Sequence, residues 1–177
     1  EAAFYSLMKY PDERLLQKTD SIVDTIISAQ EKDGYLYTAR TTHASHPRVV
    51  KFMGKERWTN MGHFSHELYN MGHMIEAAVA HYELTGNNRF LNVAIKAADL
   101  IVATFGEGKL TYPPGHQEIE LALIKLYRLT NNASYLDMTY YFLEARGKYA
   151  ERPPYTDEFF KEYHQDHLPV SEQRDMR

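Results

Sequence analysis

The chain has 177 residues, of which 44% are hydrophobic and 25% charged, and this composition is typical of one globular domain with a sizeable core. Its formal net charge is −4, no run of Lys or Arg favours nucleic-acid binding, and no apolar stretch is long enough to span a bilayer. The absence of cysteine excludes disulfides, a thiolate zinc site and a cysteine nucleophile within these residues.

Hydrophobic spacing predicts a series of helices along the chain. The first covers about residues 12–30, begins after Pro11 and ends at the turn 32–34. The other four predicted helices cover about residues 65–84, 89–104, 117–129 and 134–145. The helix at 117–129 is apolar nearly all round, which predicts burial on several sides.

Residues 35–64 lack a clear period and are predicted to be a long irregular insert. Residues 35–38 alone are compatible with a short strand. The insert contains Trp58 and three histidines, and a structureless stretch of this length is uncommon in a domain unless it is functional. The tail after Ala150 also shows little helical pattern, with prolines at 153, 154 and 169.

Two segments repeat each other. Residues 82–91 and 127–136 start 45 positions apart and share Tyr, Leu, Thr, Asn, an aromatic residue and Leu at matching offsets. Each reads as a helix end, a tight turn and a new helix start, in which Gly86 or Asn131 takes the left-handed C-cap conformation. The chain is therefore predicted to be all-α, a single domain over residues 1–177 built from antiparallel helical hairpins with one long irregular insert.

The helix predicted at 65–84, with Ser65 as its N-cap, carries histidines on one face. At 100° per residue, His66, Asn70 and His73 fall opposite the apolar stripe. Gly72 is unfavourable in mid-helix by about 1 kcal/mol relative to Ala, which indicates a close approach by another group. On an isolated hairpin such a face is simply solvated, whereas in a closed ring of hairpins it faces a central cavity. The apolar stripe consists of Leu68, Met71, Ile75, Ala78, Val79 and Tyr82.

No metal site is predicted in this chain. The zinc-protease helix motif needs a second histidine four residues after the first, and Asn70 stands at that position after His66. His66 and His73 are separated by about 10.5 Å of helix rise, which is too far for one ion.

A second histidine follows the turn Pro113-Pro114-Gly115. The turn leads into the helix predicted at 117–129, so His116 is expected at the N-terminus of that helix, where the helix dipole favours a neutral imidazole. The alternative is an ordinary loop or capping histidine. In both cases Glu118 would complement the dipole.

These segments resemble glycoside hydrolase family 127, the β-L-arabinofuranosidase family with a six-hairpin (α/α) toroid. The motifs are specific when taken together, and they run in order along nearly the whole chain. Gln117, where proline is common, and Asn70-Met71 are modest departures from the family pattern. The resemblance rests on residues 66–69, 72–82 and 115–123, supported by 30–38, 57–58, 142–147 and 163–170.

The resemblance implies a sugar pocket. His66 and His116 would bind sugar hydroxyls, with His73 close by, and Trp58 or a tyrosine would stack on the sugar ring. Asn70 would contact the substrate or help to orient the histidines. Glu67 and Glu118 would orient them from behind. The ligand would be an arabinose-containing glycan, with neither nucleic acid nor membrane as a partner.

Family members are described as retaining enzymes that use a cysteine nucleophile, held in a zinc site of cysteines and a glutamate, and a second glutamate as acid/base. All of these lie beyond Val170 in the family pattern. The resemblance therefore implies no catalytic residue and no zinc ligand in this chain, with zinc expected only in the full-length enzyme. The expected structure is a partial toroid whose two ends are truncated, with residues 1–7 inside an early helix. The exposed toroid edges would lead the isolated chain to self-associate or leave it marginally stable.

Two alternatives stay open. The chain could be a non-enzymatic helical-repeat binding module, which a separation of His66 and His116 beyond about 15 Å would favour. It could also support different carbohydrate chemistry on the same toroid, such as that of an isomerase or an unsaturated-uronide hydrolase. The latter needs paired carboxylates, and no pair stands out in the sequence. The sequence leaves the compartment unknown; the resemblance favours bacterial cytoplasm or periplasm.

Overall fold

A computed structural model of the chain describes residues 1–43, 45–146, 168 and 170–172. Apart from an isolated bridge between Phe105 and Leu110, these residues form no strand, so the all-α prediction is confirmed for them. No helix in this part of the chain is both long and apolar enough to cross a bilayer. The elements are α1 (Ala2–Lys9), α2 (Glu13–Ala29), α3 (Thr38–His43), α4 (Pro47–Met53), the π-helical turn η1 (Met61–Ser65), α5 (Glu67–Thr85), α6 (Arg89–Thr104), α7 (Ile119–Thr130), α8 (Ala133–Ala145) and the short 3-10 turn η2 (Val170–Glu172).

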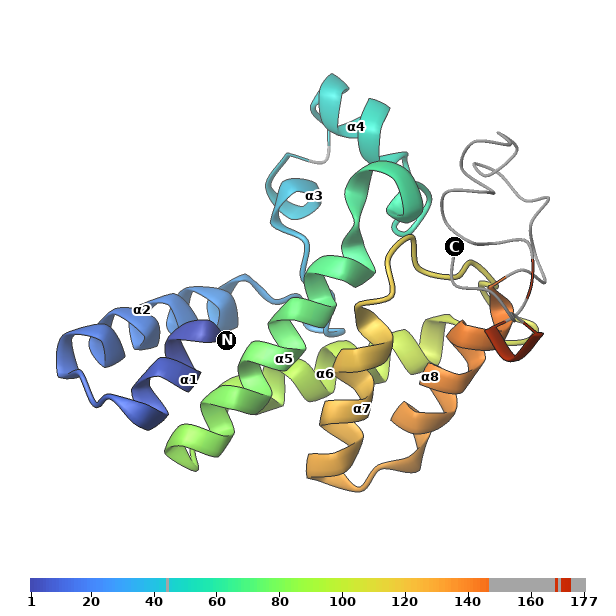
Figure 1. Ribbon diagram of the computed structural model, residues 1–177. Helices are drawn as coiled ribbons and strands as arrows, with labels where there is room; N and C mark the ends of the chain where they lie inside the picture. Colours follow the sequence, from blue (N-terminus) through green and yellow to red (C-terminus); the bar gives the residue numbers. More distant parts are fainter. Residues whose placement is uncertain (44, 147–167, 169, 173–177) are drawn as a thin grey trace.

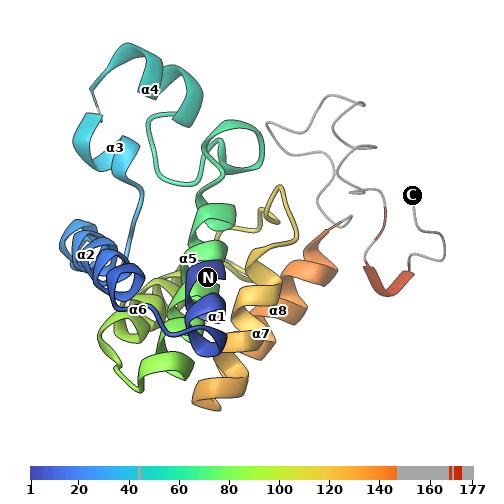
Figure 2. The same cartoon turned by 60° about the vertical axis from the view of Figure 1, so that its left-hand side comes forward.

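Helix α5 lies at the centre of the fold. It packs against α1, α6 and α7, while α7 packs on its other side against α8 (Figure 1). The helical pairs α5–α6 and α7–α8 are the two hairpins that the repeat predicts. The small helices α3 and α4, together with η1, project beyond one end of α5 (Figure 2).

Both repeated turns have the predicted geometry. Gly86 and Asn131 adopt the left-handed conformation, with φ of 67° and 57°, and each donates its N–H to the carbonyl oxygen four residues earlier. Thr85 and Thr130 also match, since each hydroxyl donates to a carbonyl of the preceding turn and accepts an N–H from the residue two positions later. The same side-chain chemistry therefore ends both helices.

Helix α6 coincides with its predicted range, and its alanine stripe is buried against the core. Helix α7 is buried on the sides that face α5 and α8, as its apolar character predicts, but not all round. Leu121 is 56% exposed, because among the described helices α5 and α8 cover only two sides of α7.

The insert is more regular than the sequence suggests. Residues 35–38 form no strand, and α3, α4 and η1 occupy a region predicted to be irregular. Tyr35 is fully buried in the core, which explains why residues 35–38 have the composition of a short strand. Pro47 opens α4 at its first turn, and the His46 side chain accepts the N–H of Arg48 as its cap. The proline and the capping histidine at the start of α4 are visible in the sequence. Both α3 and α4 are nevertheless too short to show a hydrophobic period.

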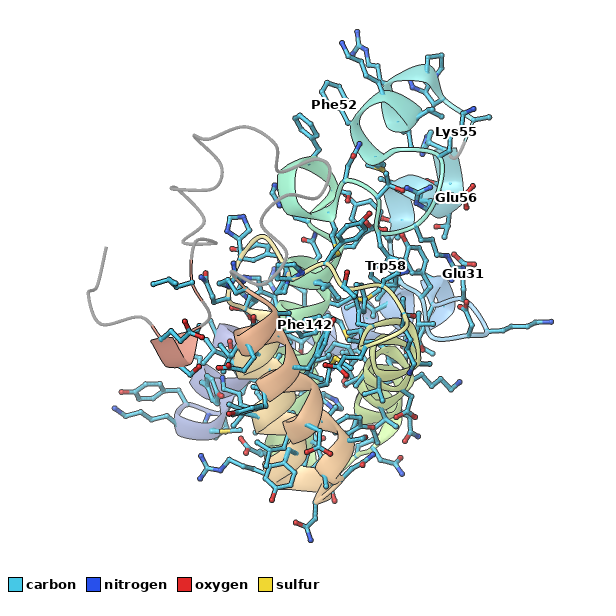
Figure 3. All side chains as sticks on the ribbon, turned by 90° about the vertical axis from the view of Figure 1, so that its right-hand side faces the viewer. Glu31, Phe52, Lys55, Glu56, Trp58 and Phe142 are labelled. Carbon is cyan, nitrogen blue, oxygen red and sulfur yellow. The ribbon has the colours of Figure 1, made fainter. Side chains whose placement is uncertain are left out.

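The projecting part of the insert carries exposed side chains. Phe52, Lys55 and Glu56 lie on it, away from the helical body that contains Phe142 (Figure 3). The predicted irregular tail after Ala150 and most of the motif at 163–170 lie outside the described residues.

Candidate sugar-binding site

His66 lies at the junction between η1 and α5. It adopts the left-handed conformation, with φ of 48°, which is uncommon for a residue with a side chain. Helix α5 therefore begins at Glu67 rather than at Ser65. The expectation that Ser65 caps the helix is wrong, because its hydroxyl donates to the Glu67 carboxylate, 2.7 Å away, and not to the helix start.

The carboxylate of Glu67 is fully buried and holds this junction in place. It accepts hydrogen bonds from the Tyr35 hydroxyl and from the backbone N–H of Trp58, which lies 3.2 Å from both carboxylate oxygens. The Arg40 guanidinium lies 3.9 Å away and supplies the opposite charge. All of these donors come from the insert, so one side chain of α5 ties residues 35–65 to the helix that carries His66.

His116 is brought to His66 by contacts between loops. Gly115 packs so closely on Gly62 in η1 that an added Cβ would lie 2.5 Å from the Gly62 carbonyl oxygen. The buried Arg146 donates to the carbonyl oxygen of Pro114 at 2.8 Å and fixes the loop from the other side. As a result, the ring centroids of His66 and His116 lie 5.0 Å apart.

The predicted position of His116 at a helix terminus is wrong. Helix α7 begins at Ile119, with Glu118 as its N-cap, so His116 lies in the preceding loop. The helix-dipole argument for a neutral His116 therefore loses its basis, because the dipole effect falls off within the first turn.

The predicted histidine face of α5 is present. The opposite stripe is buried from Leu68 to Val79, whereas Asn70 is exposed and His73 is half exposed. The Asn70 side chain donates to the His66 carbonyl oxygen at 2.9 Å and so reinforces the first turn of the helix.

Tyr69, which sequence reasoning did not single out, joins the histidines. Its ring centroid lies 4.9 Å from that of His116 and 4.5 Å from that of His73. The available signal was its spacing, three residues after His66 and four before His73, which places all three on one helix face.

Trp58 lies apart from this group. Its side chain is only 5% exposed and packs edge-on against Tyr35 and Phe105. Figure 3 shows it inside the molecule, below the projecting helices. A stacking role for Trp58 would therefore require the segment around it to rearrange.

An ionic network lies beside His73. The Nδ1 atom of His73 lies 3.1 Å from Glu118 Oε1 and 3.8 Å from Glu76 Oε2, and Lys125 Nζ lies 2.5 Å from the other oxygen of Glu76. Gly72 permits this approach, since an added Cβ would lie 2.8 Å from Glu118 Cγ. The expectation of a close approach at Gly72 is confirmed, and the approaching group is Glu118. Sequence reasoning missed Glu76, whose partners Glu118 and Lys125 lie at the start of α7 and within it, far from Glu76 in the sequence.

The two carboxyl groups of this network titrate differently. Burial, the hydrogen bond with Glu76 and the charge of Glu76 raise the pKa of Glu118 to about 7. Burial opposes ionisation of Glu76 as well, but hydrogen bonds from Glu118 and Lys125 outweigh it and lower the pKa of Glu76. Near neutral pH, Glu118 therefore exchanges a proton while Glu76 stays ionised.

We expect the stability of the chain to fall between about pH 4.5 and pH 7 through Glu118. In this range the unfolded carboxyl loses its proton while the folded one keeps it, so the folded state binds more protons and the free energy of unfolding decreases as pH rises. The Glu118→Gln variant stays uncharged and lacks this contribution. Urea unfolding of both proteins from pH 4.5 to 8 should show the wild type losing stability relative to the variant; parallel pH profiles would contradict the assignment.

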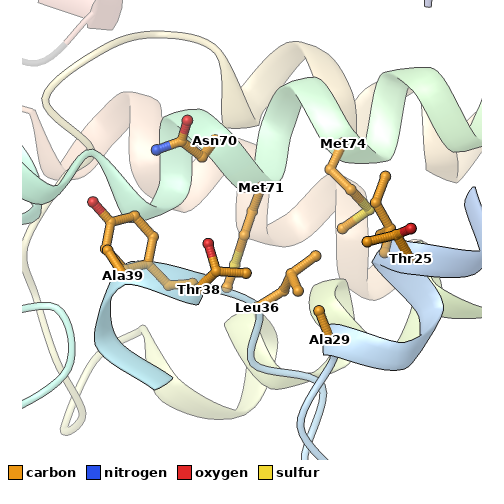
Figure 4. A pocket seen from close by; sticks show the side chains of 10 residues that line it. Thr25, Ala29, Leu36, Thr38, Ala39, Asn70, Met71 and Met74 are labelled. Carbon is orange, nitrogen blue, oxygen red and sulfur yellow. The ribbon is translucent and has the colours of Figure 1, made fainter. Parts of the chain in front are cut away.

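A pocket of about 460 Å³ adjoins the histidine face. It is an open pocket lined by the end of α2, residues 36–39 and the α5 side chains of Asn70, Met71 and Met74 (Figure 4). Asn70 is the site residue that borders it, and the remaining walls are mainly apolar.

The chain matches known proteins over nearly its whole length. Residues 1–176 match the family model described as the GH127 catalytic domain of β-L-arabinofuranosidase. The chain belongs to glycoside hydrolase family 127. A non-reducing end β-L-arabinofuranosidase of Bifidobacterium longum subsp. longum is 43% identical over 155 residues, which are 84% of this chain and 22% of that protein.

Solved GH127 structures show the same fold. A GH127 β-arabinofuranosidase superposes with a TM-score of 0.86 at 48% identity, over 98% of this chain and 26% of that one. A GH127 β-L-arabinofuranosidase from Geobacillus stearothermophilus T6 gives a TM-score of 0.79 at 39% identity, over 98% of this chain and 28% of that one. The helical hairpins are therefore part of a GH127 (α/α) toroid, and the chain spans about a quarter of the length of these relatives.

The thiolate zinc site that the resemblance implies for the full-length GH127 enzyme does not fit this chain, because the chain has no cysteine. Among the described residues, the donor atoms of His73, Glu76 and Glu118 lie within 4.8 Å of one another, a separation that one metal ion could bridge. Since Lys125 already neutralises Glu76, we interpret this group as an ionic network.

Proposed function

We propose that this chain forms the substrate-binding portion of a GH127 glycoside hydrolase that acts on terminal β-L-arabinofuranosyl or related residues. The observation that carries the proposal is the 5.0 Å separation of the His66 and His116 rings, which come from segments 50 residues apart in the chain. Two imidazoles at this spacing can hydrogen-bond neighbouring hydroxyl groups of one sugar. His73 extends the same face, and Asn70 and Glu118 support it.

The separation argues against a simple binding module of helical repeats. A separation of His66 and His116 beyond about 15 Å would favour such a module. Their ring centroids are instead 5.0 Å apart. Hydrolysis by a carboxylate pair is the other alternative. Glu76 and Glu118 are such a pair, but both side chains are largely buried and Lys125 neutralises one of them, which leaves little room for a sugar between them.

The chemistry of the reaction is proposed to lie outside this chain. By family resemblance, the parent enzyme would be retaining and would use a zinc-bound thiolate as its nucleophile, and this chain has no cysteine to supply one. The chain alone is therefore proposed to bind a sugar without cleaving it. The ligand class would be arabinose-containing glycans.

Self-association of the isolated chain stays a prediction. Large apolar side chains are exposed on α1, on the residue that follows it, on α2 and on α8. These side chains, which offer an interface for another copy, are Tyr5, Met8, Tyr10, Ile22, Ile27, Leu136 and Tyr140.

The function is tested with an aryl β-L-arabinofuranoside. We expect a longer protein that contains this chain to release the aryl group and the isolated chain to release none. In the longer protein, His66→Ala and His116→Ala should each reduce kcat/KM by at least about tenfold, the scale expected when a hydrogen bond to a polar ligand group is lost. A matched His43→Ala change, in exposed α3, should leave it unaltered. Absence of hydrolysis of any furanoside by the longer protein would reject the proposed substrate.

A further inference from the structure

An aromatic side chain is needed to complete a sugar pocket that the histidines only begin. Imidazoles give directed hydrogen bonds, whereas an aromatic ring offers apolar area against the C–H groups of a sugar. The sequence leaves the choice between Trp58 and a tyrosine open. Trp58 is only 5% exposed and packs edge-on against Tyr35 and Phe105, so its ring is buried and offers almost no surface to a ligand.

Tyr69 has the opposite surroundings. Its side chain is 38% exposed, and its ring contacts both His116 and His73, with centroid distances of 4.9 and 4.5 Å. The ring of His66 lies 6.4 Å away. Tyr69 is thus the ring that connects the His66–His116 pair with His73, and part of it stays open at the surface that the three histidines share.

The orientation of Tyr69 suits this position. It stands nearly perpendicular to His73, with an interplanar angle of 86°, and is tilted by 58° to His116. These two contacts hold the ring, and its 38% exposure shows that part of it stays uncovered. Its backbone lies in the first turn of α5, which Asn70 and Glu67 hold in place. The ring is therefore held before any ligand arrives.

We propose that Tyr69 is the aromatic residue of the sugar-binding site, contacting the sugar between the His66–His116 pair and His73. This assignment rests on the proposed function and makes it more specific. Tyr69 supplies the apolar contact, while the imidazoles of His66 and His116 select the hydroxyl pattern.

The test uses the 177-residue chain with methyl β-L-arabinofuranoside as the probe, because free L-arabinose in water is mainly a six-membered pyranose. Histidine side-chain NMR signals report occupation of the site, and nuclear Overhauser effects between the Tyr69 ring and sugar protons report the contact itself. Tyr69→Leu removes the ring, Tyr69→Phe keeps it, and Tyr140→Leu is the matched control on an exposed tyrosine of α8. Far-UV circular dichroism establishes that each variant is folded.

We expect this furanoside to shift the signals of His66 and His116 and to show contacts with the Tyr69 ring. Tyr69→Leu should weaken binding by about three- to tenfold, and Tyr69→Phe and Tyr140→Leu by less than about twofold. If the wild type binds the furanoside through His66 and His116 but Tyr69→Leu binds it equally well, the Tyr69 assignment is overturned while the proposed function stands. If the furanoside shifts neither histidine, the proposed function itself fails. Should Tyr69→Leu not fold, the Tyr69–sugar contacts in the wild type decide.

Discussion

Replacing Glu67 by alanine should lower the free energy of unfolding by about 3–5 kcal/mol, the scale for removing one partner of a buried ion pair. The change leaves the Trp58 N–H and the Tyr35 hydroxyl without their buried acceptor, and it leaves the Arg40 guanidinium without its counter-charge. Burial and the Glu67 carboxylate raise the pKa of Tyr35, so its hydroxyl stays protonated and depends on this acceptor. Urea unfolding followed by circular dichroism measures the loss.

Two further variants test whether the loss of stability in Glu67→Ala comes from the buried network. Glu67→Gln keeps the volume and one accepting oxygen, so its loss should be smaller, about 1–3 kcal/mol. Asp24→Ala removes an exposed carboxylate that pairs with Arg89 and should cost less than about 1 kcal/mol. A Glu67→Ala protein as stable as Asp24→Ala would show that the buried network contributes little.

Replacing Gly115 by alanine should separate the two histidines and destabilise the chain by about 1–3 kcal/mol, the usual cost of overpacking. The new Cβ would lie 2.5 Å from the Gly62 carbonyl oxygen and 2.8 Å from its Cα, so one backbone must move. Neither contact can be relieved by a side-chain rotation. Because His116 follows directly, its ring should move away from His66 and sugar binding should weaken.

The measurement is the nuclear Overhauser effect between the His66 and His116 rings, which the 5.0 Å centroid distance predicts in the wild type. Gly108→Ala is the control. Gly108 has a positive φ of 75° but open space around it, so alanine should cost up to about 1 kcal/mol without moving either histidine. An unchanged histidine contact in Gly115→Ala would mean that the Gly62 contact does not position His116.

Local signals were enough to predict the hairpins. Gly86 and Asn131 end their helices through chemistry contained within a few residues, and the alanine-rich face of α6 is visible as helical spacing. The histidine face of α5 follows from the same arithmetic. These features depend on neighbours in sequence, so one sequence is sufficient to infer them.

The parts that were missed depend on contacts between distant segments. The left-handed conformation of His66 follows from the burial of Glu67 among Tyr35, Arg40 and Trp58, which no local pattern reveals. The position of His116 in the loop before α7 depends on the contact between Gly115 and Gly62, which lie far apart in the sequence. The partnership of Glu76 with Glu118 and Lys125 joins two helices in the same way.

The left-handed backbone at His66 has a consequence for binding. A non-glycine residue in this conformation is strained by about 1–3 kcal/mol. The hydrogen bonds that the buried Glu67 carboxylate accepts hold the backbone in this conformation when the chain folds. The imidazoles of His66 and His116 are therefore already oriented in the ligand-free chain. An incoming ligand has little conformational entropy of the protein to remove, so more of the gross interaction energy is retained as affinity. Preorganisation of this pair is thus obtained at the expense of folding stability.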